Sequence, residues 1–370
     1  DFQTHLGTLE SRGLLRRIDR PINKDTELHP LVRWQFQGGI LEADRSAFLF
    51  TNVTDSLGRQ YDMPVAVGAL AATPEIYAIG MGVEVADIGT TWLRAIANPI
   101  APEKTEAPSC QQTIISGEEL RTPGRGLDRL PVPVSTPGYD AAPYLTATLV
   151  ITKDPETGIA NMGTYRGALK APDRLGVRMA TRIGGAGGYL HWQKYQARGE
   201  PMPVAIVVGA PPAVAITGPQ KLEVGQDEME VAGGLTGCPI RVAATTTVDL
   251  QVPADAEIVI EGLIDTELLE PEAPFGESHG HVALEEFNMS MQVTAITHKR
   301  DAVFASIISQ VTPSESSVLK KVAYEPLFLA HLRDELEVRG IRRVCMHEPL
   351  TNLRRVIFLQ FDDDAPRDEV

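Results

Sequence analysis

The feature that most constrains the fold is a series of short apolar segments between residues 144 and 311. Turn residues rather than helices separate most of them, and each has the length and the Val/Ile/Thr/Ala content of a single β-strand. The expected strands are 144–154, 203–209, 239–244, 256–262, 289–299 and 302–311. Because so many strands with few intervening helices must pair with one another, the pattern predicts a barrel or a closed sheet.

The flanking parts have a different character, with apolar residues near helical spacing. The expected helices are 4–16, 28–36 and 74–98, and the expected strands of the first part are 46–53 and 63–70. After the strand series, residues 316–340 are helical in pattern on both sides of Pro326, which predicts a kink or a second helix there. Two further strand-like runs follow, so the chain is expected to be α+β.

Domain boundaries follow from length and from proline content. A chain of 370 residues exceeds one typical core. Eight prolines in residues 99–143 exclude a continuous helix there and mark a boundary. The expected domains are 1–112 (α/β), 113–311 (β) and 312–370 (the start of a further α/β part).

Composition excludes several classes of function. The net charge of −15 argues against a nucleic-acid partner, because phosphate binding needs a basic surface. The three cysteines, Cys110, Cys238 and Cys345, are far apart, so a reducing cytoplasm is the expected location. We expect no signal peptide at the start and no membrane span, because no apolar run approaches about 18 residues.

Carboxylates and imidazoles are concentrated in PEAPFGESHGH, residues 271–281. Its prolines and glycines exclude a helix, so Glu272 and Glu277 must be aimed individually. Two nearby carboxylates perturb each other, and one can keep its proton as a general acid beside a base. The alternative is a solvated acidic loop. His279 and His281 are either metal ligands on one strand face or polar residues at a strand end.

Two other stretches offer oxygen donors and a cation. In NMGTYRGALK (161–170), Asn161 supplies an amide oxygen and Arg166 a planar fork for a carboxylate or phosphate. Alone, such an arginine after a tyrosine at a strand end is usually part of a surface ion pair. In VGQDEMEVAGGLTGCP (224–239), Glu228 precedes a helix of small residues whose N-terminus favours an anion. The alternative is an acid that only answers the helix dipole.

A glycine-rich run, RIGGAGG (182–188), lies between these stretches. It lacks the GxGxxG spacing and has no predicted strand before it, so it does not indicate a dinucleotide-binding fold. Its backbone beside Arg178 and Arg182 can still form a phosphate cradle.

In their order, these stretches give the chain a resemblance to the UbiD family of reversible decarboxylases, which use prenylated FMN. The resemblance runs from about Leu6 to Phe361. The segments that carry it are KDPETG followed by NMGTYR, PMPVAIVVGAPPA, the acid before AGGLTG, DLQVPADAEIVIEG and EAPFGESHGH. It implies a central split β-barrel of the flavin-reductase type that binds the flavin, flanked by an α/β N-terminal domain and a C-terminal α/β part.

The resemblance also implies roles for matched residues. Arg166 matches the catalytic arginine, Glu272 the glutamate paired with it, and Glu277 the acid that protonates the product carbon after CO2 leaves. Asn161 and Glu228 match ligands of a divalent ion, Mn or Mg, that bridges the flavin phosphate. A potassium ion is also compatible with the resemblance.

Further positions follow from the same resemblance. The implied cofactor-binding residues are Asn161, Thr164, Tyr165, Arg166, Arg178, Arg182, Ile183 and Glu228. Some members supply a metal-ligand His within the region that reads RIGGAGGYLHW here, where Arg182 or a following glycine aligns. His191 lies slightly too far along and is a third metal-ligand candidate only. Ser309, Gln310 and Phe328 are candidates to face the substrate.

The implied reaction is the non-oxidative, reversible decarboxylation of an aromatic or heteroaromatic carboxylic acid through a covalent adduct with prenylated FMN. The implied partners are that acid, a flavin prenyltransferase that supplies the cofactor, and further copies of the chain in a dimer or hexamer. Family chains continue past position 370, so the C-terminal part is expected to be incomplete. The alternatives are a cofactor-free hydrolase with Glu272 and Glu277 as acid and base, and a flavin-binding protein without turnover.

Overall fold

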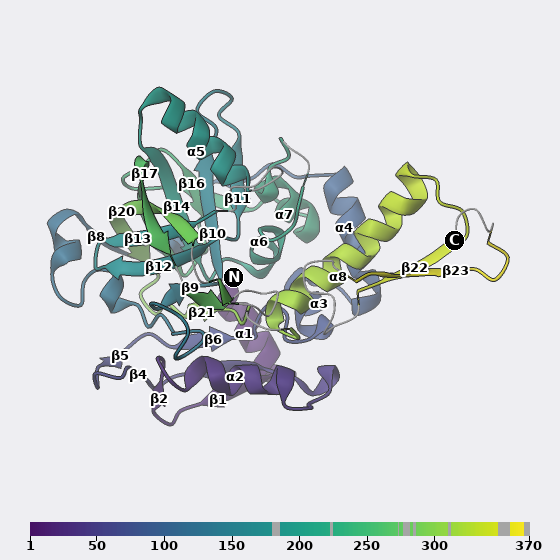
Figure 1. Ribbon diagram of the computed structural model, residues 1–370, viewed down its shortest axis with the longest axis horizontal. Coiled ribbons are helices and arrows are strands. Elements are labelled where there is room, and N and C mark those ends of the chain that lie inside the picture. Colours follow the sequence, from purple (N-terminus) through teal and green to yellow (C-terminus); the bar gives the residue numbers. More distant parts are fainter. Residues whose placement is uncertain are drawn as a thin grey trace.

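A computed structural model describes residues 1–179, 186–222, 225–272, 274–276, 282–283, 286–309, 312–346 and 356–365. Within these residues, a nine-stranded antiparallel sheet curls into a half-barrel (Figure 1). The strand order is β11-β10-β14-β17-β20-β13-β12-β9, with β8 paired to β20. Its strands are β8 (Thr113–Ser116), β9 (Tyr144–Leu145), β10 (Thr148–Lys153), β11 (Ala160–Gly163), β12 (Arg166–Ala171), β13 (Arg174–Arg178), β14 (Met202–Val208), β17 (Ile258–Glu272) and β20 (Glu286–His298). The predicted α+β class with a central barrel-like sheet is confirmed.

Both faces of this sheet are apolar, as β14 illustrates. Val204 and Ile206 belong to the main core, whereas Ala205 and Val207 belong to a second core on the opposite face. Helix α5 (Gly187–Arg198) contributes Trp192 to the main core. The second core is covered by α6 (Pro212–Thr217), α7 (Glu228–Thr236), β15 (Arg241–Ala244) and β16 (Gln251–Pro253). Covering both faces buries the near-continuous apolar runs seen in the sequence.

The first part of the chain, together with β21 (Phe304–Ser306), forms a smaller four-stranded sheet with the order β1-β3-β6-β21. Its elements are α1 (Phe2–Ser11), β1 (Leu15–Ile18), α2 (Leu28–Gln37), β3 (Ala47–Phe50), β6 (Val65–Val67), α3 (Pro74–Met81) and α4 (Ile88–Ala97). The remaining short strands are β2 (Ile22–Asn23), β4 (Val53–Thr54), β5 (Gln60–Tyr61) and β7 (Glu103–Lys104).

Strand β21 (Phe304–Ser306) corrects one expectation. The apolar run 302–311 was expected to extend the barrel-like sheet, but β21 pairs in parallel with β6 in the smaller sheet. An apolar run shows that a strand is buried, not which sheet edge it completes. The chain therefore returns from the large sheet to its own N-terminal part.

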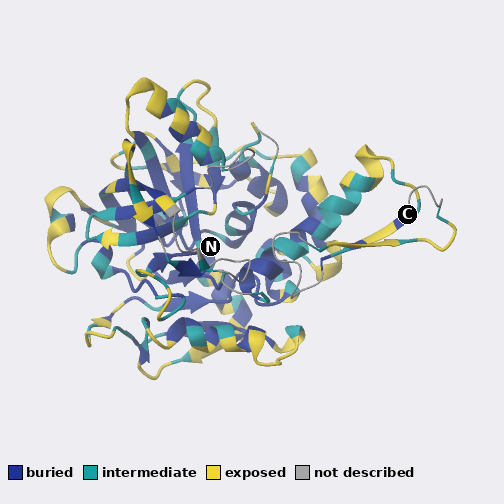
Figure 2. Ribbon diagram, viewed as in Figure 1, coloured by how far each residue is buried: buried dark blue, intermediate teal, exposed yellow. Residues whose placement is uncertain are grey.

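The last part begins with α8 (Glu315–Ala330), which continues through Pro326, so no second helix begins there. Pro326 instead packs on α4, where a Cβ on Gly89 would lie 2.6 Å from the Pro326 Cβ. A hairpin of β22 (Ile341–Cys345) and β23 (Phe358–Phe361) follows and projects away from the large sheet (Figure 1). Strand β23 is mostly exposed (Figure 2).

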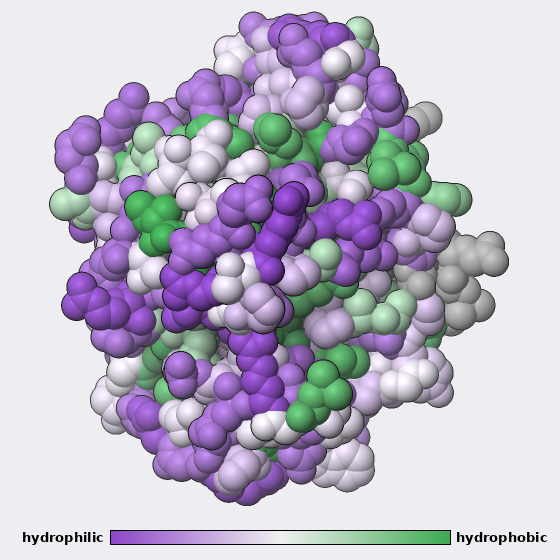
Figure 3. Space-filling model, turned by 90° about the vertical axis from the view of Figure 1, so that its left-hand side faces the viewer, coloured by the Kyte–Doolittle hydropathy of each residue, from purple (hydrophilic) through white to green (hydrophobic). Residues whose placement is uncertain are grey.

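Two more sequence-based expectations need correction. Strand β13 does precede the glycine-rich run, although its sequence RLGVR, with arginines at both ends and a central glycine, gave no strand signal. Glu228 lies in the first turn of α7 rather than before the helix. Among the described helices, none is both long enough and apolar enough to cross a membrane. The face shown in Figure 3 is mainly hydrophilic, with small scattered hydrophobic areas.

Candidate active site

Arg166 and Glu272 form a bidentate ion pair. The guanidinium donates from Nε to Oε1 at 2.6 Å and from Nη2 to Oε2 at 2.8 Å. The Glu272 side chain is fully buried, and only 13% of the Arg166 side chain is exposed. Fork-to-fork geometry of this kind is among the strongest charge-assisted contacts in proteins. The structure thus brings together the two residues whose pairing the motif order implies.

The curl of the sheet makes this pair possible. Arg166 begins β12 and Glu272 ends β17, and both β13 and β20 lie between these strands. In a flat sheet, strands three positions apart are separated by about 14 Å, and side chains perpendicular to it would not meet. Curvature turns both side chains toward one interior.

Phe275 covers the guanidinium on another side. Its ring centroid lies 4.6 Å from Cζ of Arg166. The Phe275 ring packs in turn on Tyr144, with 4.4 Å between centroids and 49° between planes. An arginine stacked on an aromatic ring is shielded from water and held in orientation. Arg166 is therefore fixed by a carboxylate and by a ring.

A loop at Asp140 and Ala141 holds the segment that carries this ring. The Ala141 amide donates to the Pro274 carbonyl at 2.9 Å, and the Gly276 amide donates to Oδ1 of Asp140 at 3.1 Å. The other oxygen of Asp140 accepts from the Thr136 amide at 2.6 Å. Burial raises the pKa of Asp140 above its ordinary value, while these amides partly oppose the shift.

A second group of oxygen atoms lies where β11 approaches α7. Glu228 is 8% exposed and accepts from the Met162 amide at 2.9 Å. Met162 directly follows Asn161 in the chain. Burial raises the pKa of Glu228 to about 7. A bound cation would favour the charged form of such a carboxylate. The described residues alone contain no group of three His, Cys, Asp or Glu that could hold a metal.

The Asn161 side chain is packed against the start of α5. Its Nδ2 donates to the Tyr165 hydroxyl at 3.4 Å, and that hydroxyl also accepts from the Gly188 amide at 3.4 Å. A Cβ on Gly187 would lie only 1.9 Å from Oδ1 of Asn161. Glycine at 187 therefore leaves the space that the amide oxygen occupies. Asn161 and Glu228 together supply oxygen donors of the type that Mn and Mg prefer.

Three other residues predicted to bind the cofactor or the metal lie on or beside β12, β13 and α5. Arg178 is directly opposite Arg166 in the β12–β13 ladder, whereas Thr164 is exposed just before β12. His191 lies on α5, where its Nδ1 is 2.9 Å from Oγ1 of Thr152, so one ring nitrogen is engaged in the core.

The predicted substrate-facing residues lie in the last part of the chain. Phe328 is on α8, with its ring stacked on Tyr324 at 5.5 Å. Ser309 accepts at its carbonyl from the Ser316 hydroxyl at 3.4 Å. The predicted residues outside the described part of the chain are Arg182, Ile183, Glu277, His279, His281 and Gln310.

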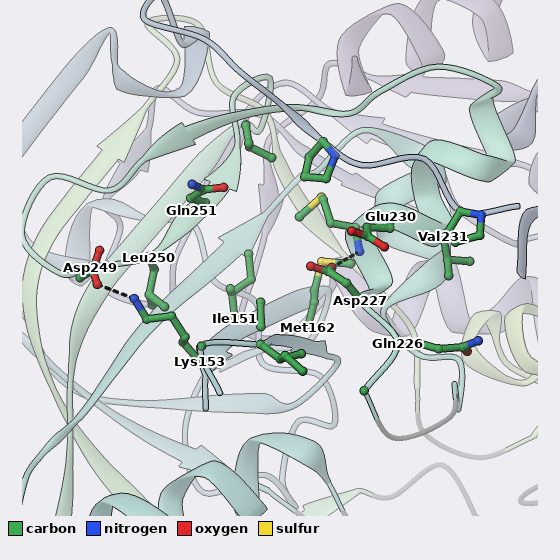
Figure 4. A pocket seen from close by; sticks show the side chains of 18 of the residues that line it. Ile151, Lys153, Met162, Gln226, Asp227, Glu230, Val231, Asp249, Leu250 and Gln251 are labelled. Atoms are coloured by element: carbon green, nitrogen blue, oxygen red, sulfur yellow. Dashed lines mark hydrogen bonds and ion pairs between the residues drawn. The ribbon is translucent and has the colours of Figure 1, made fainter. Parts of the chain in front are cut away.

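The described residues also line a cavity of about 500 Å³ that contains neither Arg166 nor Glu272. The ion pair of Lys153 and Asp249 lies at one side of it, and Asp227 and Glu230 lie at the other (Figure 4). Met162 connects the cavity to the Asn161–Glu228 region, since its side chain lines the cavity while its amide bonds to Glu228.

Four residues near the ion pair were missed in the sequence: Asp140, Tyr144, Phe275 and Asn288. Asn288 is 1% exposed, and neither of its amide atoms has a hydrogen-bond partner in the part of the chain that the structure describes. Its side chain lies against Gly176, where a Cβ would be 2.3 Å from Nδ2. Only Phe275 had a signal, because it lies inside the motif at 271–281.

Two family models match the chain. The N-terminal domain of 3-octaprenyl-4-hydroxybenzoate carboxy-lyase matches residues 6–96, and its Rift-related domain matches residues 103–311. An uncharacterized Synechocystis protein is 29% identical in an alignment of 360 positions that covers 91% of this chain and 68% of that protein.

Solved structures agree with these models. The UbiD-class enzyme HmfF of Pelotomaculum thermopropionicum, in an evolved dimeric form in complex with prFMN, is 30% identical with a TM-score of 0.87. That match covers 100% of this chain and 80% of HmfF. The Klebsiella pneumoniae 3,4-dihydroxybenzoic acid decarboxylase AroY shares the fold, with 22% identity, a TM-score of 0.84, and coverage of 100% and 76%. The resemblance seen in the motifs is thereby confirmed, and the chain belongs to the UbiD family.

Proposed function

We propose that the chain is a carboxy-lyase that catalyses the prenylated-FMN-dependent, non-oxidative and reversible decarboxylation of an aromatic or heteroaromatic carboxylic acid. The observation that carries the proposal is the buried bidentate pair of Arg166 and Glu272 on the inner face of the curled sheet. Its context is a family in which the similar HmfF was solved in complex with prFMN.

The chemistry explains why a cofactor is required. Loss of CO2 from an sp² carbon leaves an electron pair that no side chain can stabilise, and prenylated FMN supplies the electron sink when bound. The protein contributes position, exclusion of water and one proton. Per turnover the C–CO2 bond breaks, a C–H bond forms and one proton is consumed.

The surroundings of Arg166 and Glu272 support the roles proposed for them, and the family resemblance supplies the role proposed for Glu277. Arg166 is proposed to keep a positive charge at the reacting carboxylate of the substrate. Glu272 and Phe275 hold the plane of the Arg166 guanidinium in one orientation. Glu277, which directly follows Gly276 in the chain, is proposed to protonate the product carbon. A carboxylate that accepts from a guanidinium at both oxygens is a poor general acid. The pairing of Glu272 therefore argues against the alternative of a hydrolase that uses Glu272 and Glu277 as acid and base.

The proposed cofactor site lies where β11 approaches α7 and the start of α5. The amide oxygen of Asn161 and the buried carboxylate of Glu228 are proposed to hold Mn or Mg at the flavin phosphate, with potassium as a second candidate ion. Arg178 and the backbone at Thr164 and Tyr165 would hold the phosphate itself. His191, through its second ring nitrogen, is a weaker candidate ligand.

Partners are proposed at the level of class. They are an aromatic or heteroaromatic acid, for which Phe328 and Gln310 are candidate contacts, a flavin prenyltransferase as cofactor supplier, and further copies of the chain in a dimer or hexamer. The dimeric form of HmfF supports an oligomer.

The test is co-expression with a flavin prenyltransferase, followed by absorption spectroscopy and mass analysis of the extracted cofactor. The protein is then incubated with a panel of arenes and heteroarenes in D2O. Prenylated flavin with deuterium exchange into one compound is expected and would name the product class. A protein that takes up no flavin under these conditions would overturn the proposal.

A further inference from the structure

We propose that Asp140 is a positioning residue for this reaction, acting on Arg166 through Gly276 and Phe275. The inference rests on the proposed function, because it assigns Asp140 a part in keeping the guanidinium aligned with Glu272. The carboxylate oxygens of Asp140 accept from the backbone amides of Gly276 and Thr136. Its effect is carried by the short segment that follows β17.

The contacts form a continuous path. Oδ1 of Asp140 accepts from the Gly276 amide at 3.1 Å, and the Ala141 amide donates to the Pro274 carbonyl at 2.9 Å. These two bonds hold the backbone on both sides of Phe275. The ring of Phe275 then lies 4.6 Å from Cζ of Arg166. A shift of this backbone would therefore move the ring that covers the guanidinium.

Hydrogen bonds from the N-terminal part of the chain hold the turn that carries Asp140. Arg33 on α2 donates from Nη2 to the Ser135 carbonyl at 2.5 Å and to the Thr136 hydroxyl at 3.3 Å. The Thr136 carbonyl accepts from the Tyr139 and Asp140 amides, both at 3.0 Å. The turn that presents Asp140 is thus attached to α2, while its carboxylate is attached to the Arg166 side.

Position 140 requires a carboxylate, because two backbone amides there each need an acceptor oxygen. Both oxygens of Asp140 accept from backbone amides, Oδ1 from Gly276 and Oδ2 from Thr136. Asparagine has one carbonyl oxygen, and its NH2 group would face an amide N–H at the other place. Asp140→Asn therefore loses one of the two bonds, and Asp140→Ala loses both.

The chain contains a matched control. Asp128 accepts from the amide four residues earlier, Gly124, at 2.6 Å, as Asp140 does from Thr136. An arginine also lies near it, since Nη1 of Arg59 is 3.7 Å from Oδ2. The contacts of Asp128 among the described residues are with Gly124 and Arg59. Substitutions at 128 thus report the cost of losing such a turn, without the link to the site.

The experiment compares the cofactor-loaded Asp140→Asn, Asp140→Ala, Asp128→Asn and Asp128→Ala variants, with Phe275→Ala as reference. We expect kcat to fall at least about tenfold in Asp140→Ala with a smaller change in KM, and by less in Asp140→Asn. Combining Asp140→Ala with Phe275→Ala should add little, because both act on one contact. The Asp128 variants should keep kcat within about twofold of wild type. Turnover in Asp140→Ala equal to that of Asp128→Ala would overturn the proposal.

A second readout needs no turnover. The Arg166 Nε–H resonance, assigned by its loss in Arg166→Lys, reports the hydrogen bond to Glu272 in 15N-labelled protein. We expect it to shift and to exchange faster with water in Asp140→Ala and Phe275→Ala but not in Asp128→Ala. An unchanged resonance in Asp140→Ala would refute the positioning role even if the wild-type protein proved not to be a decarboxylase.

Discussion

Arg166 and Glu272 are 106 positions apart in the chain, yet both oxygens of Glu272 accept from one guanidinium. Two residues earlier on the same strand, Glu270 binds Arg174 at 2.7 Å through Oε1 only, and its Oε2 has no partner among the described residues. The two neighbouring pairs therefore differ in geometry and burial. That difference allows one to serve as the control for the other.

Arg166→Lys and Glu272→Gln are expected to abolish measurable decarboxylation. Lysine cannot make the two parallel bonds, and glutamine leaves a mostly buried guanidinium without its countercharge. Removing one partner of a buried pair costs about 3–5 kcal/mol, so we also expect a lower unfolding midpoint. Product formation and thermal unfolding measure the two effects.

The control for that prediction is Glu270→Gln. The Arg174 side chain is 42% exposed, so its pair with Glu270 is screened by water and contributes little. Turnover should stay within about twofold of wild type. An equal loss of turnover in Glu270→Gln would show that the two pairs do not differ in function.

Glu277→Gln is expected to stop turnover while leaving the flavin bound. Glutamine preserves size and polarity but has no carboxylic proton to give to the product carbon. Flavin content is measured by absorption and turnover by product formation, and the loss of proton transfer is measured by deuterium exchange into the product. Near-normal exchange in this variant would remove Glu277 from the proposed role.

Binding of Mn²⁺ is expected to strengthen as the pH rises toward about 7, because Glu228 must lose its proton and burial raises its pKa to about 7. In the absence of metal, a rise in pH lowers the contribution of Glu228 to folding stability, which is opposite to its effect on Mn²⁺ binding. The folded-state pKa lies above the unfolded value, so the contribution of Glu228 is fully present below about 4.5 and is lost as the pH rises through about 7. Titration calorimetry and thermal unfolding from pH 5 to pH 8 measure both trends.

Glu228→Gln should remove most of the pH dependence of Mn²⁺ binding together with most of the affinity. Glu315 is the matched control, since it is buried and burial likewise raises its pKa to about 7. Its oxygens accept from the amides of Gly68 and Leu70, both at 3.0 Å. Glu315→Gln should lower stability and leave Mn²⁺ affinity unchanged; a similar loss of affinity in both variants would contradict the assignment of Glu228.

Asn288→Val is expected to raise the free energy of unfolding by about 1 kcal/mol and to lower turnover. The buried Asn288 amide has no hydrogen-bond partner among the described residues and so carries an uncompensated desolvation cost, which valine removes at a strand position that suits it. Such costs are concentrated at functional sites. Denaturant unfolding and product formation test the pair of effects, and a variant that is both less stable and fully active would disprove the expectation.

The sequence predicted the parts of the fold that depend on local patterns. Apolar runs bounded by turn residues indicated β10, β14, β17 and β20 of the large sheet, and helical spacing indicated α2 and α8. The order of the motifs was enough to associate Arg166 with Glu272 and Asn161 with Glu228, through the family resemblance. The strand and helix predictions succeeded because side-chain periodicity and turn chemistry are expressed within a few consecutive residues. The association of Asn161 with Glu228 stays a prediction.

Only the tertiary structure decided how these parts meet. The curl of the sheet closes the Arg166–Glu272 pair across two strands, and β21 joins the smaller sheet rather than the large one. Asp140 contacts Gly276 over 136 positions, from a loop with no motif of its own. Such contacts are selected by curvature, burial and the satisfaction of backbone amides over the whole chain, and no short stretch of sequence expresses those quantities.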